Sequence, residues 1–248
     1  MIAFIQHQNK TFKVDLSKPI DISLSLQAGS NNPTAWYVEP PKIEAVKMDD
    51  WIGEVKKGSS VNFFNIFFNP HGHGTHTECV GHISEEKESV NDCIKTFFFI
   101  AQLVSIKPKS VGEDLVLTKS QIEGLLKPDC KALIIRTLPN NENKKSMQYS
   151  NTNPPYIDKG LAIYLKNKGI KHLLIDLPSV DKEKDNGVLA AHHAFWDFPQ
   201  NTRFDCSITE LIFVPNNIKD GSYLLNLCFA PFKNDASPSK PTLYKIYD

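Results

Sequence analysis

Four of the eight histidines in this 248-residue chain lie in the stretch NPHGHGTHTECVGH, residues 69–82, together with Glu78. Histidine is the commonest side-chain metal ligand and the usual proton carrier near neutral pH. If residues 74–79 are extended, His76 and Glu78 point to the same side, because alternate side chains of a strand share a face. This pair predicts half of a site for a divalent metal such as zinc or manganese. His82 would lie beside the metal, where it can donate or accept a proton.

A half-site needs further ligands from elsewhere in the chain. The candidates are the doublet His192–His193 in NGVLAAHHAFW and Glu210 in ITELIFV. An acidic side chain inside an apolar strand is costly to bury unless it is paired or bound to a metal. Two structural interpretations stay open: Glu210 can form an ion pair with an Arg or Lys, and the clustered histidines can make hydrogen bonds within a tight glycine-rich turn.

The segment LLIDLPSVD, residues 173–181, places Asp176, Ser179 and Asp181 at the end of an apolar run. Functional groups often gather where strands end at one edge of a sheet, but Ser179 and Asp181 can equally cap a turn or the next helix. The sequence contains no G-x-S-x-G elbow, P-loop or G-x-G-x-x-G motif. This argues against a serine hydrolase, an NTPase and a dinucleotide-dependent enzyme.

Short apolar runs rich in β-branched and aromatic residues predict the strands that position these groups. The runs cover residues 60–68, 96–106, 131–137, 171–177, 208–214 and 223–229. Two helical patterns lie between them: TKSQIEGLL opens with a capping box, and YIDKGLAIYLKNKG begins after two prolines and stops at a glycine. This order predicts an α/β fold, with a mixed β-sheet core and flanking helices, in one domain spanning residues 1–248.

The composition is that of an ordinary globular protein. Lys and Arg number 28, as do Asp and Glu, so the net charge is zero. This argues against a nucleic-acid binder, because phosphates require a basic excess or patch. The five cysteines are an odd number without a C-x-x-C pair, which favours reduced thiols in the cytoplasm. We expect neither a signal peptide nor a membrane anchor, since no apolar run approaches the roughly 20 residues that span a bilayer.

The order of GHGTHTECVGH, LLIDLPSVD, AAHH and TEL resembles that of the cyclase-like metal hydrolases, which include bacterial kynurenine formamidases and isatin hydrolases. Their signature is H-x-G-T-H-x-D-x-P-x-H, followed by a D-x-x-S-x-D segment, a metal-binding His and a metal-binding Glu. The resemblance extends from about Ile20 to Val214. It implies the swivelling β/α/β-type cyclase fold, a homodimer or homotetramer, and a divalent metal, with zinc expected and manganese as the alternative.

Carried over by position, the resemblance makes His76 a metal ligand, Glu78 the equivalent of the metal-binding Asp, and His82 the proton-transfer residue. It makes Glu210 the metal-binding Glu. The downstream metal-binding His corresponds to His192, with its neighbour in the doublet as the rival.

Two positions depart from this signature. Val80 replaces the proline, which costs only loop rigidity. Gly72 occupies the place of the first metal histidine, and either His71 or His73 could supply that ligand through a local bulge. On a regular strand both would face away from His76. A mononuclear, rearranged or lost metal site therefore stays open.

The activity that the resemblance implies is hydrolysis of an amide or similar C–N bond in a small substrate. The metal would activate water and polarise the carbonyl, and His82 would carry a proton to the leaving nitrogen. Trp36 and Tyr37 lie in a region that resembles the substrate loop of the family; they could stack on an aromatic substrate or simply pack against the core. Two other hypotheses are a binding or structural protein that has lost catalysis, and a metal enzyme with lactone, cyclic-imide or dehydratase chemistry.

Overall fold

A ring of paired strands forms the centre of the computed structural model, which describes residues 1–128 and 130–247. The ring runs β17–β16–β9–β12–β14–β15–β8 and closes because β8 pairs back onto β17. Its strands are β8 (His76–Glu78), β9 (Phe98–Ile106), β12 (Ala132–Thr137), β14 (His172–Ile175), β15 (Ser207–Glu210), β16 (Gly221–Phe229) and β17 (Ala236–Tyr247). β9, β12, β14 and β15 are parallel, and the remaining pairings of the ring are antiparallel. At β17 the sheet continues into β1 (Ile2–His7), β2 (Lys10–Asp15) and β3 (Ile20–Asp21).

Both faces of the central strands are buried, and successive side chains of β12 alternate between them. Ala132 and Ile134 belong to an apolar cluster shared with β9, β14, β16 and β17. Leu133 and Ile135 belong to a second cluster that includes the helices. The run KALIIRT is therefore apolar throughout, as is usual for parallel strands that are covered on both sides.

Three helices cover this second face: α3 (Lys119–Ile122), α4 (Lys159–Asn167) and α5 (Ala190–Trp196). α3 and α4 correspond to the two predicted helices. The capping box between Thr118 and Gln121 is present, and Asp158 caps α4 by accepting the Leu161 N–H. α5 has no counterpart in the sequence-based prediction, because its N-cap residue, Leu189, makes no capping bond and the carboxylate at its start comes from Asp181, distant in the sequence.

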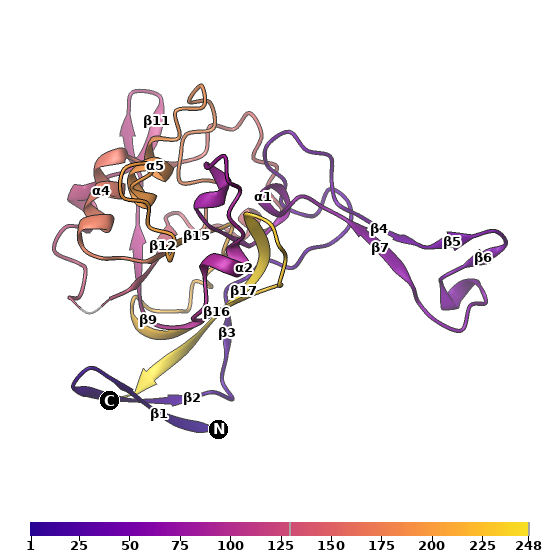
Figure 1. The fold of residues 1–248 in the computed structure, drawn as a ribbon, viewed down its shortest axis with the longest axis horizontal. Coiled ribbons are helices and arrows are strands. Elements are labelled where there is room, and N and C mark those ends of the chain that lie inside the picture. The colour runs from indigo at the N-terminus through magenta and orange to yellow at the C-terminus, as the bar shows by residue number, and fades with distance from the viewer. Residues whose placement is uncertain (129, 248) are drawn as a thin grey trace.

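Residues 42–67 form an arm that projects away from the ring (Figure 1). In this arm β4 (Lys42–Ala45) pairs with β7 (Phe64–Phe67), and β5 (Lys47–Met48) pairs with β6 (Trp51–Ile52) before the 3-10 turn η1 (Val55–Lys57). The apolar run 60–68 predicts a longer strand. Only β7 forms within it, and its side chains are exposed.

The smaller elements are α1 (Pro70–His73), η2 (Val80–His82), α2 (Val90–Cys93), η3 (Glu142–Ser146) and the sheet of β10 (Lys109–Val111), β11 (Asp114–Leu117) and β13 (Tyr156–Ile157). The predicted α/β class, with a mixed sheet core and flanking helices, is confirmed. Across the two described ranges, none of the helices combines the length and hydrophobicity that crossing a bilayer requires.

Candidate metal centre

β8 and β15 lie side by side and position the first candidate ligands. Their antiparallel register places His76 opposite Glu210, and both side chains are buried. His76 Nε2 lies 3.4 Å from Glu210 Oε2. The other imidazole nitrogen, Nδ1, donates to the Gly74 carbonyl at 2.9 Å, which leaves Nε2 to face the carboxylates. β8 is extended as predicted, so His76 and Glu78 share one of its faces.

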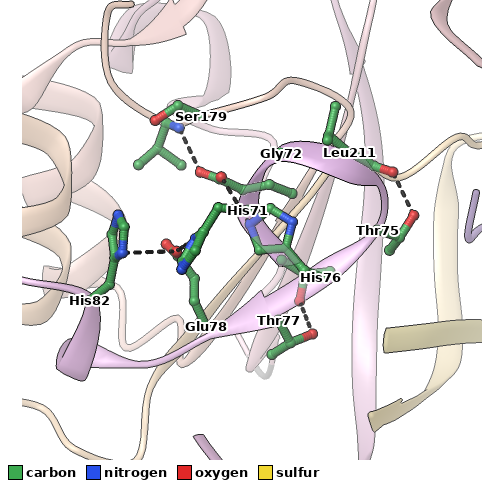
Figure 2. A network of polar contacts seen from close by, with 12 residues as sticks. His71, Gly72, Thr75, His76, Thr77, Glu78, His82, Ser179 and Leu211 are labelled. Atoms are coloured by element: carbon green, nitrogen blue, oxygen red, sulfur yellow. Dashed lines mark hydrogen bonds and ion pairs between the residues drawn. The ribbon is translucent and has the colours of Figure 1, made fainter. Parts of the chain in front are cut away.

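His71 reaches the same cluster from the helical turn α1. Asn69 caps this turn by accepting the Gly72 N–H at 3.1 Å, and a proline occupies the first helical position. His71 Nδ1 lies 3.2 Å from Glu78 Oε2. A regular strand would have turned His71 away from His76; because the chain is helical here, the two ring centroids are 5.1 Å apart. Figure 2 shows both histidines close to Glu78.

His73, the rival of His71, lies outside this cluster. Its Nδ1 accepts the Asn69 N–H at 2.8 Å, and its Nε2 donates to the Glu39 carbonyl at 2.8 Å. Burial lowers the pKa of His73, which favours the neutral ring that this pair of bonds requires. Both nitrogens are thus used by the backbone.

Helix α5 brings His192, and not its neighbour, to the cluster. His192 Nε2 lies 3.1 Å from Glu78 Oε1, and its Nδ1 lies 2.6 Å from Asp181 Oδ2. Asp181 also accepts the N–H groups of Ala191 and His192, at 2.7 and 3.1 Å, and so anchors the start of α5. His193 instead donates from Nδ1 to the Phe198 carbonyl at 3.2 Å.

The segment 173–181 supports the cluster without supplying its centre. Glu210 Oε1 accepts the Val180 N–H at 2.9 Å, which orients that carboxylate. Asp176 lies elsewhere: it pairs with Lys144 at 2.9 Å and accepts the Thr137 N–H. Ser179 accepts the N–H of the aspartate two residues later, which is a turn contact.

His82, in η2, stands at the rim of the cluster. Its ring stacks on that of His71, with centroids 4.3 Å apart, and its side chain is 30% exposed, whereas that of Glu78 is 0% exposed. His82 Nδ1 lies 4.0 Å from Glu78 Oε2 and 3.2 Å from Asp235 Oδ2. Asp235 has no counterpart among the residues predicted from the sequence. Figure 2 shows His82 on the opposite side of Glu78 from His76.

The ionisable groups of the cluster shift one another's pKa values. Burial alone would lower the pKa of His71, but hydrogen bonds to Asp235 and Glu78 raise it to about 10. Burial opposes ionisation of Glu78, yet the charge of His82 and hydrogen bonds from His192 and His71 hold its pKa well below the usual range. The pKa of His192 is likewise raised to about 10 by Asp181 and Glu78, against the effect of burial. Without a metal, carboxylates therefore face protonated imidazoles.

The donor set fits a divalent cation. His76 Nε2 and Glu78 Oε2 are buried, and within the described part of the chain their contacts with Glu210 and His71 are ion pairs that lack hydrogen-bond geometry; this is costly unless something else binds them. Ligand atoms of His71, His76 and Glu78 lie within 4.8 Å of one another. Within residues 1–128 and 130–247, Glu78 and Glu210 form ion pairs with histidines and with no Lys or Arg. Imidazole and carboxylate donors suit a divalent metal ion.

The predicted substrate loop lies beside α1. Trp36 is half-buried against a small apolar cluster formed by Ala35, Tyr149 and Leu211. Tyr37 is exposed, and its hydroxyl donates to Glu183 Oε1 at 2.7 Å. The two aromatic residues therefore differ: one packs against the body and the other is held by a surface hydrogen bond.

Comparison with known proteins gives consistent results. Residues 14–182 match the family described as "Putative cyclase". Kynurenine formamidase from Bacillus anthracis is 28% identical over 233 residues, covering 93% of this chain and 99% of that protein. Isatin hydrolase A from Labrenzia aggregata superposes with a TM-score of 0.67 at 15% identity, covering 92% of this chain and 93% of that chain. A protein described as a predicted metal-dependent hydrolase, from Bacillus stearothermophilus, gives a TM-score of 0.63 at 18% identity and covers 92% and 98%. The fold and the family match agree, and this chain belongs to the cyclase family.

Proposed function

We propose that this chain is a metal-dependent hydrolase that cleaves the C–N bond of a small amide or formamide, with an arylformamidase-like substrate. One observation carries the proposal: imidazoles and carboxylates from three separate parts of the chain converge within ion-pair distance of one another, and two of their buried atoms, His76 Nε2 and Glu78 Oε2, make no hydrogen bond within the described residues. The ligands would be His71, His76, Glu78, His192 and Glu210. The kynurenine formamidase from Bacillus anthracis, similar over most of this chain, supports the substrate class.

The metal would be zinc, with manganese as the alternative, and when bound it would lower the pKa of water and polarise the substrate carbonyl. His82 would be the catalytic residue. It is the most exposed histidine of the cluster, and its Nδ1 is already directed at a carboxylate. Its Nε2 can therefore take a proton from the attacking water and pass it to the leaving nitrogen. Of the two aromatic residues of the neighbouring loop, Tyr37 is exposed and would contact the substrate, whereas Trp36, which packs against the body of the protein, would support that loop.

Lactone, cyclic-imide or dehydratase chemistry at the same site is a second hypothesis. It is supported by the structural likeness to isatin hydrolase A, whose name gives a cyclic substrate. A third hypothesis, a binding protein that has lost catalysis, rested on Gly72 at a ligand position. The position of His71, one residue earlier, weakens that hypothesis. We place the enzyme in the cytoplasm, because all five of its cysteines are free.

Elemental analysis and an assay of N-formylkynurenine and isatin hydrolysis test the proposal directly. We expect bound zinc, and activity that a chelator abolishes and added zinc restores. His192→Ala should lose metal, while the matched variant His193→Ala should keep it. His82→Ala should keep the metal and lose about 100-fold or more in kcat. Chelator-insensitive hydrolysis, or a wild-type protein that takes up no metal, would overturn the proposal.

A further inference from the structure

Asp235 joins the cluster from the far end of the chain. It directly precedes β17, which pairs with β8 in a register that sets Ala236 opposite Glu78. The Asp235 carbonyl accepts the Cys79 N–H at 3.0 Å, and the preceding Asn234 carbonyl accepts another backbone N–H at 2.9 Å. The backbone around Asp235 is therefore fixed independently of its own side chain.

One carboxylate oxygen of Asp235 contacts two histidines. Asp235 Oδ2 lies 2.8 Å from His71 Nε2 and 3.2 Å from His82 Nδ1. Because a carboxylate oxygen only accepts, both of these nitrogens must carry protons. The second ring nitrogen of each histidine, His71 Nδ1 and His82 Nε2, is then available to bind a metal or to transfer a proton. His71 Nδ1 faces Glu78 Oε2 at 3.2 Å, and His82 Nε2 has no hydrogen-bond partner among the described residues.

We infer that Asp235 is a positioning residue that selects the tautomers of His71 and His82, so that one binds metal through Nδ1 and the other transfers protons through Nε2. The inference rests on the proposed function for the role of the two histidines. Metal-binding histidines commonly donate their second N–H to a carboxylate, which fixes the ring and increases its basicity. A proton-transfer histidine needs the same support to keep its active nitrogen unprotonated. Here one carboxylate would serve both.

The competing role for Asp235 is direct metal binding. Ligand atoms of His71, His82 and Asp235 also lie within 4.8 Å of one another. The two roles predict different changes in zinc binding when the side chain is replaced. Loss of a ligand that completes its own metal position changes the number of ions bound, whereas loss of a positioning carboxylate lowers affinity by about 10- to 100-fold without changing that number.

The experiment compares wild type with Asp235→Asn, which keeps the size of the side chain and removes its charge. Asp92→Asn is the control, because Asp92 forms an exposed ion pair with Lys95. Zinc is titrated into metal-free protein by calorimetry, and 15N chemical shifts report the ring tautomers in the zinc-loaded protein. For Asp235→Asn we expect unchanged stoichiometry, zinc affinity about 10- to 100-fold weaker, and a shift of His82 towards the Nε2-protonated form.

On the substrate that the wild type hydrolyses, kcat of Asp235→Asn should fall by a similar factor, about 10- to 100-fold, while KM changes little. Asp235→Glu should recover part of the wild-type tautomer pattern. If Asp235→Asn binds fewer zinc ions than the wild type, Asp235 is a metal ligand. If its zinc affinity and its histidine tautomers equal those of the wild type, Asp235 does not position either histidine. Either result overturns the inference. The zinc and 15N measurements need no substrate, so a failure of the proposed hydrolase activity is recognised separately.

Discussion

Gly72 packs where a side chain would meet Val38 and the Ala35 carbonyl. A Cβ added there would lie 2.7 Å from Val38 Cγ2 and 3.2 Å from the Ala35 oxygen. The Gly72 carbonyl also accepts the Ala35 N–H at 2.9 Å, so the two segments cannot easily separate. A histidine at the position that resembles the first metal histidine of the family would therefore require Val38 and the paired backbone of residues 35 and 72 to shift. His71, one residue earlier in α1, faces Glu78 instead.

A pair of substitutions tests the assignment of His71. His71→Ala should abolish zinc binding at that metal position, a larger loss than the about 10- to 100-fold expected for a positioning residue, because it removes an imidazole ligand beside Glu78. His73→Ala should leave zinc affinity near the wild-type value, since both ring nitrogens of His73 contact the backbone outside the cluster. Zinc titration of the two purified variants decides between them. Equal losses of affinity, or a larger loss in His73→Ala, would contradict the assignment.

The protonation of the site predicts how metal binding depends on pH. His71 and His192 have pKa values raised to about 10, so both are protonated in the metal-free protein at neutral pH. A metal needs them neutral, and its binding must therefore release protons. Zinc affinity should rise with pH up to about 10, by about tenfold per pH unit for each proton released. Calorimetry in buffers of different ionisation enthalpy measures this number. Binding without proton release would show that neither histidine is a ligand.

The same raised pKa values affect the stability of the metal-free protein. A histidine whose folded pKa lies above its unfolded value of about 6.5 stabilises the fold fully below that pH. This contribution is lost as the pH rises towards about 10. Alkaline solutions should therefore destabilise the metal-free protein while they favour metal uptake.

At the level of elements, the extended conformation of β8 could be predicted from the sequence, whereas the helical turn α1 could be predicted only in part. The alternation of His76 and Glu78 on one strand face follows from the sequence once residues 74–79 are taken as extended. The turn that carries His71 also has a local signal, because Asn69 followed by a proline is a typical helix start. This helix-start pattern predicts that His71 lies on a helix and not on a regular strand.

Other parts of the site depend on pairings that no local pattern encodes. Asp181 is a candidate cap for the next helix, and it does accept N–H groups at the start of α5, ten and eleven residues away; where that helix begins, which decides between His192 and His193, was not predicted. Asp235 enters the site only because β17 closes the ring against β8. A strand register between distant segments is set by the whole sheet. Neither feature could be predicted from spacing alone.

At the scale of the whole molecule, the arm of residues 42–67 projects away from the ring (Figure 1), and within the described residues its strands β4 and β7 pair only with each other. In the register of β4 with β7, Ile43 pairs with Ile66 and Ala45 pairs with Phe64, so these four residues form one apolar face. Phe64 is 40% exposed and Ile66 is 54% exposed. An isolated two-stranded ribbon is marginally stable in water, and contiguous exposed apolar surface usually marks an interaction site. Because the resemblance to the cyclase-like hydrolases implies a homodimer or homotetramer, we propose that a second copy of the chain covers this face.

Replacing Phe64 and Ile66 together with serine should therefore shift the protein from a dimer or tetramer to a monomer. The substitutions remove large apolar side chains from the ribbon while its backbone pairing stays available. Light scattering after size-exclusion chromatography measures the mass. Phe204→Ser is the control, because Phe204 is 51% exposed and lies outside the arm; it should leave the mass unchanged. Zinc stoichiometry should also stay the same, since neither arm residue belongs to the metal cluster. A monomeric wild type, or a double variant with the wild-type mass, would show that the arm does not join subunits.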